Sequence, residues 1–145
     1  MKTTILIAAA AAVVFSTELQ DILSSKMRAA PQPSFFHALH QVETSGRHGP
    51  ILGDGGRALG PLQIHRAYWV DSRVPGRYED CADLNYSIRV VSAYLKRYAR
   101  AAWDSNSVDV LARVHNGGPQ GHRKKATLRY AAKVKAALVK VGQRS

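Results

Sequence analysis

A glycine-rich ribbon between residues 46 and 62 most constrains how this chain of 145 residues can fold. It contains six glycines and two prolines, a density that favours turns over a continuous helix. On both sides of the ribbon, apolar residues recur every three to four positions, which is the spacing of an amphipathic helix. We therefore predict a mainly α fold (α+β), in which helices surround the ribbon and a small β element forms near residues 50–60.

Several segments carry the helical pattern. The first begins near Ser34, a residue type that caps helices, and its apolar stripe runs through Phe35, Leu39 and Val42. Further helical segments are expected at residues 62–69, at 80–101, from 104 or 105 to 114, and at 127–141. The inward positions of the last one are Leu128, Ala131, Val134, Ala137, Leu138 and Val141.

The N-terminal segment predicts export. Lys2 supplies a positive charge ahead of an apolar run at residues 5–15, which has the length of a signal-peptide core. This run is shorter than the about 20 apolar residues that span a membrane. We expect a signal peptide at residues 1–17, a connector at 18–33 and one domain at 34–145. The protein is expected to be secreted or periplasmic, with no membrane span in the mature chain.

Charge limits the classes of partner that the protein can bind, and cysteine content limits how the fold can be stabilised. The formal net charge of +11 lies entirely in residues 86–145, because positive and negative side chains cancel in residues 1–85. A basic half attracts polyanions, and together with export it favours anionic cell-envelope polymers over a specific nucleic acid. Cys81 is the one cysteine, so no intrachain disulfide can form, and we expect it to be a buried small hydrophobe.

Two carboxyl groups are candidates for acid–base chemistry. Glu43 ends the first helix and shares a face with Phe36 and Leu39, so partial burial should favour the protonated form that a general acid needs. Asp54 follows eleven residues later within the ribbon, where a carboxylate could stabilise positive charge. A solvated helix end for Glu43 and an ordinary Gly-Asp-Gly turn for Asp54 are the open alternatives.

Other kinds of site find less support. His37, His40 and Glu43 recur every three residues, with His48 close by, yet zinc hydrolases place two histidines four residues apart around a glutamate. We therefore expect no metal and no cofactor. The sequence also lacks the glycine-flanked serine of many hydrolases, a phosphate-binding loop and a dinucleotide-binding glycine pattern.

Several motifs occur in the order found in one known family. They are Glu43-Thr44-Ser45-Gly46, Gly60-Pro61-Leu62-Gln63-Ile64, Tyr68-Trp69-Val70-Asp71, His115-Asn116-Gly117-Gly118-Pro119 and Thr127-Leu128-Arg129-Tyr130. Over residues 37–131 the chain resembles the invertebrate-type (destabilase-family) lysozymes, as a microbial relative low in cysteine. More distantly it is similar to soluble lytic transglycosylases and goose-type lysozymes. The resemblance implies a lysozyme-like catalytic domain.

The resemblance also implies roles for individual residues. Glu43 matches the proton donor of the family, and Asp54 matches its second carboxylate. The residues expected to line the saccharide cleft are Gln63, Tyr68, Trp69, His115, Asn116 and Gly117. Among these, Tyr68 and Trp69 could stack on sugar rings, since aromatic faces suit apolar sugar surfaces.

The activity implied is that of a muramidase, a bacteriolytic glycosidase that hydrolyses the β-1,4 bond between N-acetylmuramic acid and N-acetylglucosamine. Its substrate is then peptidoglycan or another N-acetylhexosamine polysaccharide. One alternative is a lytic transglycosylase that uses Glu43 alone, because the loop from Glu43 to Asp54 departs from the family's cysteine-bearing loop. The other is a cationic protein that binds cell-wall saccharide without catalysis.

Overall fold

The computed structural model describes residue 31 and residues 33–143. The predicted signal peptide and most of the predicted connector lie outside the described residues. Within the described part, no helix combines the length and the apolar character needed to cross a membrane.

Helices dominate the described chain, as the apolar spacing predicts. The α-helices are α2 (Pro33–Thr44), α3 (Arg66–Ser72), α4 (Leu84–Tyr98), α5 (Arg100–Asp104), α6 (Val108–Gly117) and α7 (Leu128–Gly142). Short 3₁₀ helices are η1 (Asp54–Gly56), η2 (Tyr78–Ala82), η3 (Gly121–Arg123) and η4 (Lys125–Thr127).

The glycine-rich ribbon and the residues directly after it form a small antiparallel sheet. Its strands are β1 (Leu52–Gly53), β2 (Ala58–Leu59) and β3 (Ile64–His65), in the order β1-β2-β3. Leu52 pairs with Leu59, and Leu59 also pairs with Ile64 on its other side. The expected β element near residues 50–60 is confirmed, and so is the mainly α class of the fold. The segment 62–69, predicted as a short helix, contains β3 followed by the first turn of α3.

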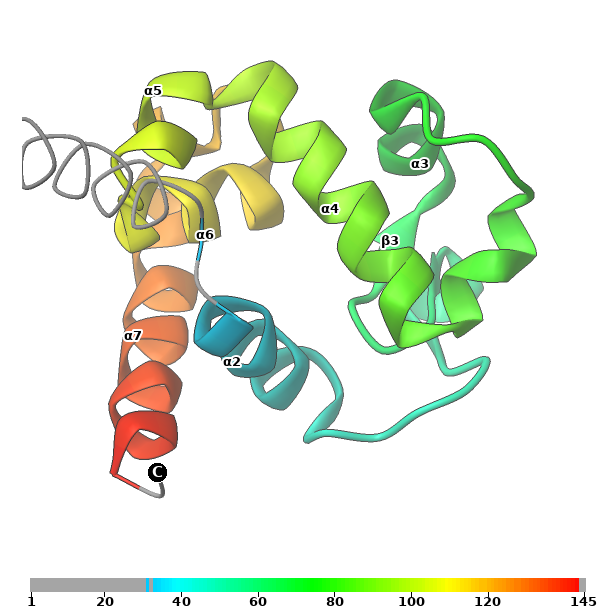
Figure 1. The fold of residues 1–145 in the computed structure, drawn as a ribbon, viewed down its shortest axis with the longest axis horizontal. Helices are drawn as coiled ribbons and strands as arrows, with labels where there is room; N and C mark the ends of the chain where they lie inside the picture. The colour runs from blue at the N-terminus through cyan, green and yellow to red at the C-terminus, as the bar shows by residue number, and fades with distance from the viewer. Residues whose placement is uncertain (1–30, 32, 144–145) are drawn as a thin grey trace, which may run out of the picture.

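Helix α4 crosses the middle of the molecule between two groups of elements (Figure 1). In one group α2 packs against α7, and α7 also packs against α6. In the other, α3 packs against α4, and the sheet lies beside α3 and η2. The candidate residues of the ribbon and those of the C-terminal helices therefore come from two different sides of α4.

The long helix predicted at residues 80–101 is divided in the structure. Helix α4 begins only at Leu84, because Asp83 Oδ1 accepts a hydrogen bond from the backbone nitrogen of Tyr86 at 2.7 Å and so caps the first turn. Ala99 leaves helical geometry, with φ −140° and ψ 43°, which separates α4 from α5. The apolar stripe is correctly predicted, whereas the breaks come from local backbone geometry.

Two further boundary predictions and one prediction of an inward-facing residue are wrong. Ser34 is not the cap of α2, because the helix already includes Pro33, whose fixed φ suits a first helical position. Helix α6 starts at Val108 rather than at residue 104 or 105, since Asp104 still belongs to α5. Leu128 is 50% exposed instead of facing inward. The buried face of α7 follows residues 127, 131 and 134, and position 128 lies about 100° around the helix from it.

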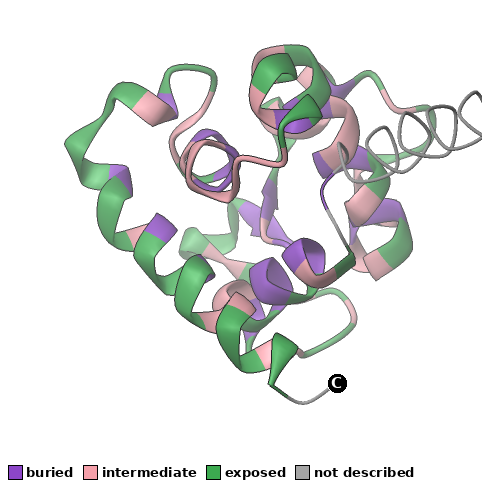
Figure 2. Cartoon of the chain, turned by 60° about the vertical axis from the view of Figure 1, so that its left-hand side comes forward, coloured by how far each residue is buried: buried purple, intermediate pink, exposed green. Residues whose placement is uncertain are grey.

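The core gathers the inward faces of α2, α4 and α6 with residues of the ribbon. Its fully buried side chains include Phe35, Leu39, Leu62, Ile64, Leu95 and Leu111. Figure 2 shows buried residues on the inner sides of the helices and exposed residues on their outer sides. Cys81 is also fully buried, and burial raises the pKa of its thiol to about 12, so the expectation of a small core hydrophobe is confirmed.

Gly60 fixes how the ribbon approaches η2. Its φ is +81°, and a Cβ atom placed on it would lie 1.8 Å from the backbone oxygen of Cys81. A larger residue is therefore disfavoured both by the left-handed backbone and by the backbone contact. This close approach sets the position of the strands that flank Asp54.

Candidate active site

Glu43 lies in the last turn of α2 and is the most enclosed of the candidate acids. Its side chain is 17% exposed, so the predicted partial burial is confirmed. The hydroxyl of Tyr130, from α7, donates a hydrogen bond to Glu43 Oε1 at 2.5 Å. His115 Nε2, from α6, lies 3.4 Å from the same oxygen. Three helices therefore meet at this carboxyl group.

His115 connects Glu43 to an aromatic pair behind it. The imidazole is only 4% exposed, and its Nδ1 lies 3.1 Å from the hydroxyl oxygen of Tyr68. The Tyr68 ring stacks on Tyr94 of α4, with ring centres 3.6 Å apart and an interplanar angle of 15°. We refer to Glu43, Tyr68, Tyr94, His115 and Tyr130 as the Glu43 cluster.

The three tyrosines of the Glu43 cluster are held in their neutral phenol form. Burial, followed by the charge of Glu43, raises the pKa of Tyr130 well above its ordinary value. Burial and the neighbouring Tyr94 raise the pKa of Tyr68 in the same way. Burial also raises the pKa of Tyr94 to about 12. These hydroxyls can therefore act as hydrogen-bond donors throughout the neutral range.

Asp54 has very different surroundings. It opens η1 with a left-handed φ of 50°, and its side chain is 46% exposed. Arg57 Nη2 donates to Oδ1 at 2.8 Å, and His65 Nε2 lies 3.4 Å from Oδ2. None of the described contacts of Asp54 joins it to the Glu43 cluster. A role as the second carboxylate stays a prediction.

Gln63 and Trp69 are occupied within the fold. The Gln63 amide donates to the backbone oxygens of Ile51 and Gly60, at 3.2 and 2.9 Å, and so holds the ribbon together. Trp69 Nε1 donates to the Tyr86 hydroxyl at 2.9 Å. Both polar groups already have hydrogen-bond partners in the protein. Saccharide binding by these two residues stays a prediction, and it would have to use the part of each side chain that is still exposed.

Asn116 and Gly117 form the C-terminal end of α6, next to His115. Asn116 is exposed, whereas the Gly117 carbonyl accepts a hydrogen bond from Lys124 Nζ at 2.6 Å. Of the residues predicted for the saccharide cleft, the structure brings Tyr68 and His115 to Glu43 and places Asn116 one residue from them. Tyr68 is stacked on Tyr94 rather than standing free, so one face of its ring is already covered.

Tyr130 is the contributor that the sequence analysis did not select. It is 87 residues from Glu43 along the chain, and only the packing of α2 on α7 brings them together. A signal is nonetheless present in the sequence. Tyr130 lies beside Ala131 and one turn before Val134, both fully buried, so it borders the inward face of its helix.

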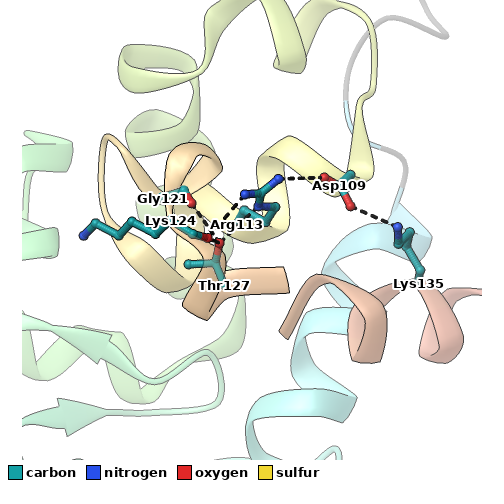
Figure 3. A network of polar contacts seen from close by, with 6 residues as sticks. All are labelled: Asp109, Arg113, Gly121, Lys124, Thr127 and Lys135. Carbon is teal, nitrogen blue, oxygen red and sulfur yellow. Dashed lines mark hydrogen bonds and ion pairs between the residues drawn. The ribbon is translucent and has the colours of Figure 1, made fainter. Parts of the chain in front are cut away.

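A polar network fixes the start of α7, and with it Tyr130 (Figure 3). Arg113 of α6 donates from Nε to Thr127 Oγ1 at 3.1 Å and from Nη2 to the Lys124 carbonyl at 3.3 Å. Lys135 Nζ donates to Asp109 Oδ1 at 2.9 Å, which ties α7 to α6 a second time. The hydrogen bond from Lys135 lowers the pKa of Asp109.

Metal binding finds no support among the described residues. No group of three or more His, Cys, Asp or Glu side chains in this part of the chain is arranged to hold an ion. His40 Nε2 lies 2.7 Å from the Arg47 carbonyl oxygen, and its ring meets that of His48 edge-on. These histidines hold the turn after α2.

Two cavities flank the candidate residues. One of about 420 Å³ lies beside Asp54 and is lined by Gly56, Arg57, His65, Arg66, Ala67 and Tyr78. Another of about 660 Å³ lies between α2 and α7. Neither is lined by a member of the Glu43 cluster, so the hydrogen bonding of the carboxyl, rather than the size of a cavity, identifies the candidate acid.

Several curated proteins are similar in sequence. Lysozyme 1 of Crassostrea virginica is 47% identical over 93 residues, covering 63% of this chain and 49% of the relative. The invertebrate-type lysozyme of Ruditapes philippinarum is 38% identical over 78 residues, covering 52% of this chain and 57% of the relative. The chain thus spans about half the length of these relatives.

Solved structures show the same fold. The Tapes japonica lysozyme gives a TM-score of 0.59 at 31% identity, covering 73% of this chain and 92% of that one. The inhibitor-bound lysozyme of Meretrix lusoria gives 0.62 at 27% identity, covering 73% and 89%. The predicted lysozyme-like fold is confirmed. Because the Destabilase family pattern matches residues 36–137, which is most of the chain, the protein belongs to the Destabilase family.

Proposed function

We propose that the protein is a muramidase, a glycosidase that hydrolyses the β-1,4 bond between N-acetylmuramic acid and N-acetylglucosamine in peptidoglycan. The observation that carries the proposal is the Glu43 carboxyl, partly buried at a helix end and contacted by Tyr130 and His115. Membership of a family whose relatives are lysozymes supports the same chemistry. A partly enclosed carboxyl suits general acid catalysis, because it can lose and regain a proton beside a bound sugar.

In this mechanism Glu43 gives its proton to the glycosidic oxygen as the bond to the sugar breaks. Positive charge then develops at the anomeric carbon, and Asp54 is the carboxylate proposed to stabilise or attack it. Water then adds to the anomeric carbon, and Glu43 takes the proton that the water loses. The sum of these steps is hydrolysis, with Glu43 back in its starting state.

The position of Asp54 favours one alternative reaction. Its two oxygens already face Arg57 and His65, and the side chain is nearly half exposed. If Asp54 takes no part, the sugar's own 6-hydroxyl can attack the anomeric carbon while Glu43 accepts its proton. That reaction yields a 1,6-anhydro sugar, so the enzyme would be a lytic transglycosylase.

The basic residues of α7 support a cell-envelope partner. Arg129, Lys133, Lys135 and Lys140 are exposed along this helix. Such a surface attracts anionic envelope polymers, and the attraction weakens as salt screens the charges. We infer an extracellular or periplasmic site of action from this charge, together with the predicted signal peptide.

Digestion of purified peptidoglycan, followed by mass spectrometry of the fragments, tests the proposal. The wild-type protein should release fragments with reducing N-acetylmuramic acid ends, and Glu43→Gln should release none. Glu79→Gln is the matched control, because Glu79 is exposed and its ion pair among the described residues is a long one, with Arg66 at 3.7 Å. Anhydro ends would establish the transglycosylase instead. Binding to peptidoglycan without fragments from the wild type would establish a non-catalytic wall-binding protein.

A further inference from the structure

The two oxygens of the Glu43 carboxyl are not equivalent. Oε1 faces both Tyr130 and His115, whereas Oε2 has no hydrogen-bond partner among the described residues. Oε2 is also absent from the buried side-chain atoms that lack a partner in this part of the chain. Oε2 is therefore not sealed in the core, and it is the carboxyl oxygen that no described group engages.

The Tyr130 hydroxyl presents a hydrogen to Oε1, and His115 does so in one of its two neutral tautomers. The Tyr130 hydroxyl donates to Oε1, and burial together with the Glu43 charge keeps that phenol protonated by raising its pKa. The Tyr68 hydroxyl lies 3.1 Å from His115 Nδ1, and if it donates there, the imidazole hydrogen resides on Nε2, which faces Oε1. The opposite tautomer would turn a nitrogen lone pair toward the carboxylate oxygen, which is unfavourable.

We propose that Tyr130 is a positioning residue that, with His115, keeps Oε1 of Glu43 as a hydrogen-bond acceptor, so that the catalytic proton is carried on Oε2. This inference rests on the proposed function and assigns the proton to one atom of the acid. The proton leaves Oε2 for the glycosidic oxygen, and the electron pair of the breaking bond stays on that oxygen. Oε2 later recovers a proton from the attacking water.

Tyr130 also acts on the transition state of the first step. A hydrogen bond to a carboxylate stabilises the charged form more than the neutral form. As Glu43 loses its proton, the bond from Tyr130 strengthens, and this stabilises the transition state of the first step. The groups that face Glu43 are Tyr130 from α7, His115 from α6 and Tyr68 from α3.

Tyr130→Phe tests the inference, because it removes only the hydroxyl. We expect kcat on soluble peptidoglycan fragments to fall about tenfold, with little change in KM. The alkaline limb of the pH–activity profile should move to higher pH, because the hydrogen bond that stabilises the carboxylate is lost. Tyr98→Phe is the matched control, because Tyr98 packs its ring on Tyr94 but its hydroxyl has no hydrogen-bond partner among the described residues. This control should leave both kcat and the profile unchanged.

A second measurement keeps the inference testable if Tyr130→Phe folds poorly. Fluorotyrosine at position 130 gives a more acidic phenol of nearly the same size, which donates a stronger hydrogen bond. The alkaline limb should then move to lower pH, opposite to its movement in Tyr130→Phe. Unchanged profiles in both variants, beside an inactive Glu43→Gln, would overturn the role of Tyr130 and leave the muramidase proposal standing. An active Glu43→Gln would overturn the muramidase proposal itself.

Discussion

Glu43 and Asp54 are eleven residues apart in the chain, yet they are held in opposite ways. The partners of Glu43 come from α6 and α7, 72 and 87 residues further along the chain. The partners of Asp54 are Arg57 and His65, which are only three and eleven residues further along the chain. One carboxyl is thus fixed by the assembly of the whole fold, and the other by a local turn in contact with water. The difference teaches that two candidate carboxyl groups of one chain can depend on separate parts of the structure.

Replacing Glu43 should have the largest effect on activity and a small one on stability. Glu43→Gln should lower kcat about 10²–10⁴-fold, because the amide cannot transfer a proton. Tyr130 can still donate to the amide oxygen, so we expect the free energy of unfolding to change by less than about 1 kcal/mol. Steady-state kinetics and urea denaturation measure the two quantities. A large loss of stability would mean that Glu43 supports the fold more than the chemistry.

Disturbing the ribbon that carries Asp54 should mainly lower the stability of the fold. Gly60→Ala should cost about 2–4 kcal/mol of unfolding free energy, because a Cβ atom there collides with the Cys81 carbonyl and φ is +81°. Gly142→Ala is the control, since a Cβ atom at that position meets nothing within 4 Å. Thermal or urea denaturation of both variants gives the comparison. Equal stability of the two would show that the ribbon tolerates a shift away from η2.

Asp54→Asn should affect activity less than Glu43→Gln does. We expect kcat to fall about 10²-fold if the carboxylate stabilises the developing positive charge. The unfolding free energy should change by less than about 1 kcal/mol, because the ion pair with Arg57 is solvent-exposed. Kinetics with product analysis provides the readout. Full activity with anhydro products would assign the chemistry to Glu43 alone.

The ion pair that joins α6 to α7 should make a small, pH-dependent contribution to the unfolding free energy. The pKa of Asp109 is lowered in the folded state, chiefly by its hydrogen bond from Lys135. Its contribution is therefore present above the unfolded-state pKa, near 3.8, and is lost as pH falls through the lowered folded pKa. Because Asp109 is 39% exposed, solvent screening limits the contribution to about 0.5 kcal/mol.

Asp109→Asn measured against the wild type by urea denaturation at pH 7 and pH 2 provides the test. The variant should be less stable at pH 7, and the difference should shrink toward zero at pH 2. An equal difference in unfolding free energy at both pH values would show that the Asp109 side chain stabilises the fold through packing rather than through its charge.

Local patterns predicted the features that depend on neighbours in sequence. The stripe of Phe35, Leu39 and Val42 gave the inward face of α2, and the glycines of the ribbon indicated its turns. The partial burial of Glu43 followed from the same stripe. Tyr130 was not predicted as its partner, because the helical pattern places Tyr130 at the border of the inward face of α7 but does not show that α2 packs there. The break of the predicted 80–101 helix likewise depends on single residues, Asp83 as a cap and Ala99 as a kink.

The burial of Cys81 determines which redox conditions the protein can fold in. Its thiol is sealed in the core with a pKa of about 12, so the reactive thiolate is nearly absent at neutral pH. The chain holds no second cysteine for it to bond with. Folding of this protein therefore needs neither an oxidant nor a disulfide isomerase, and the native state should withstand reducing agents and mild oxidants alike.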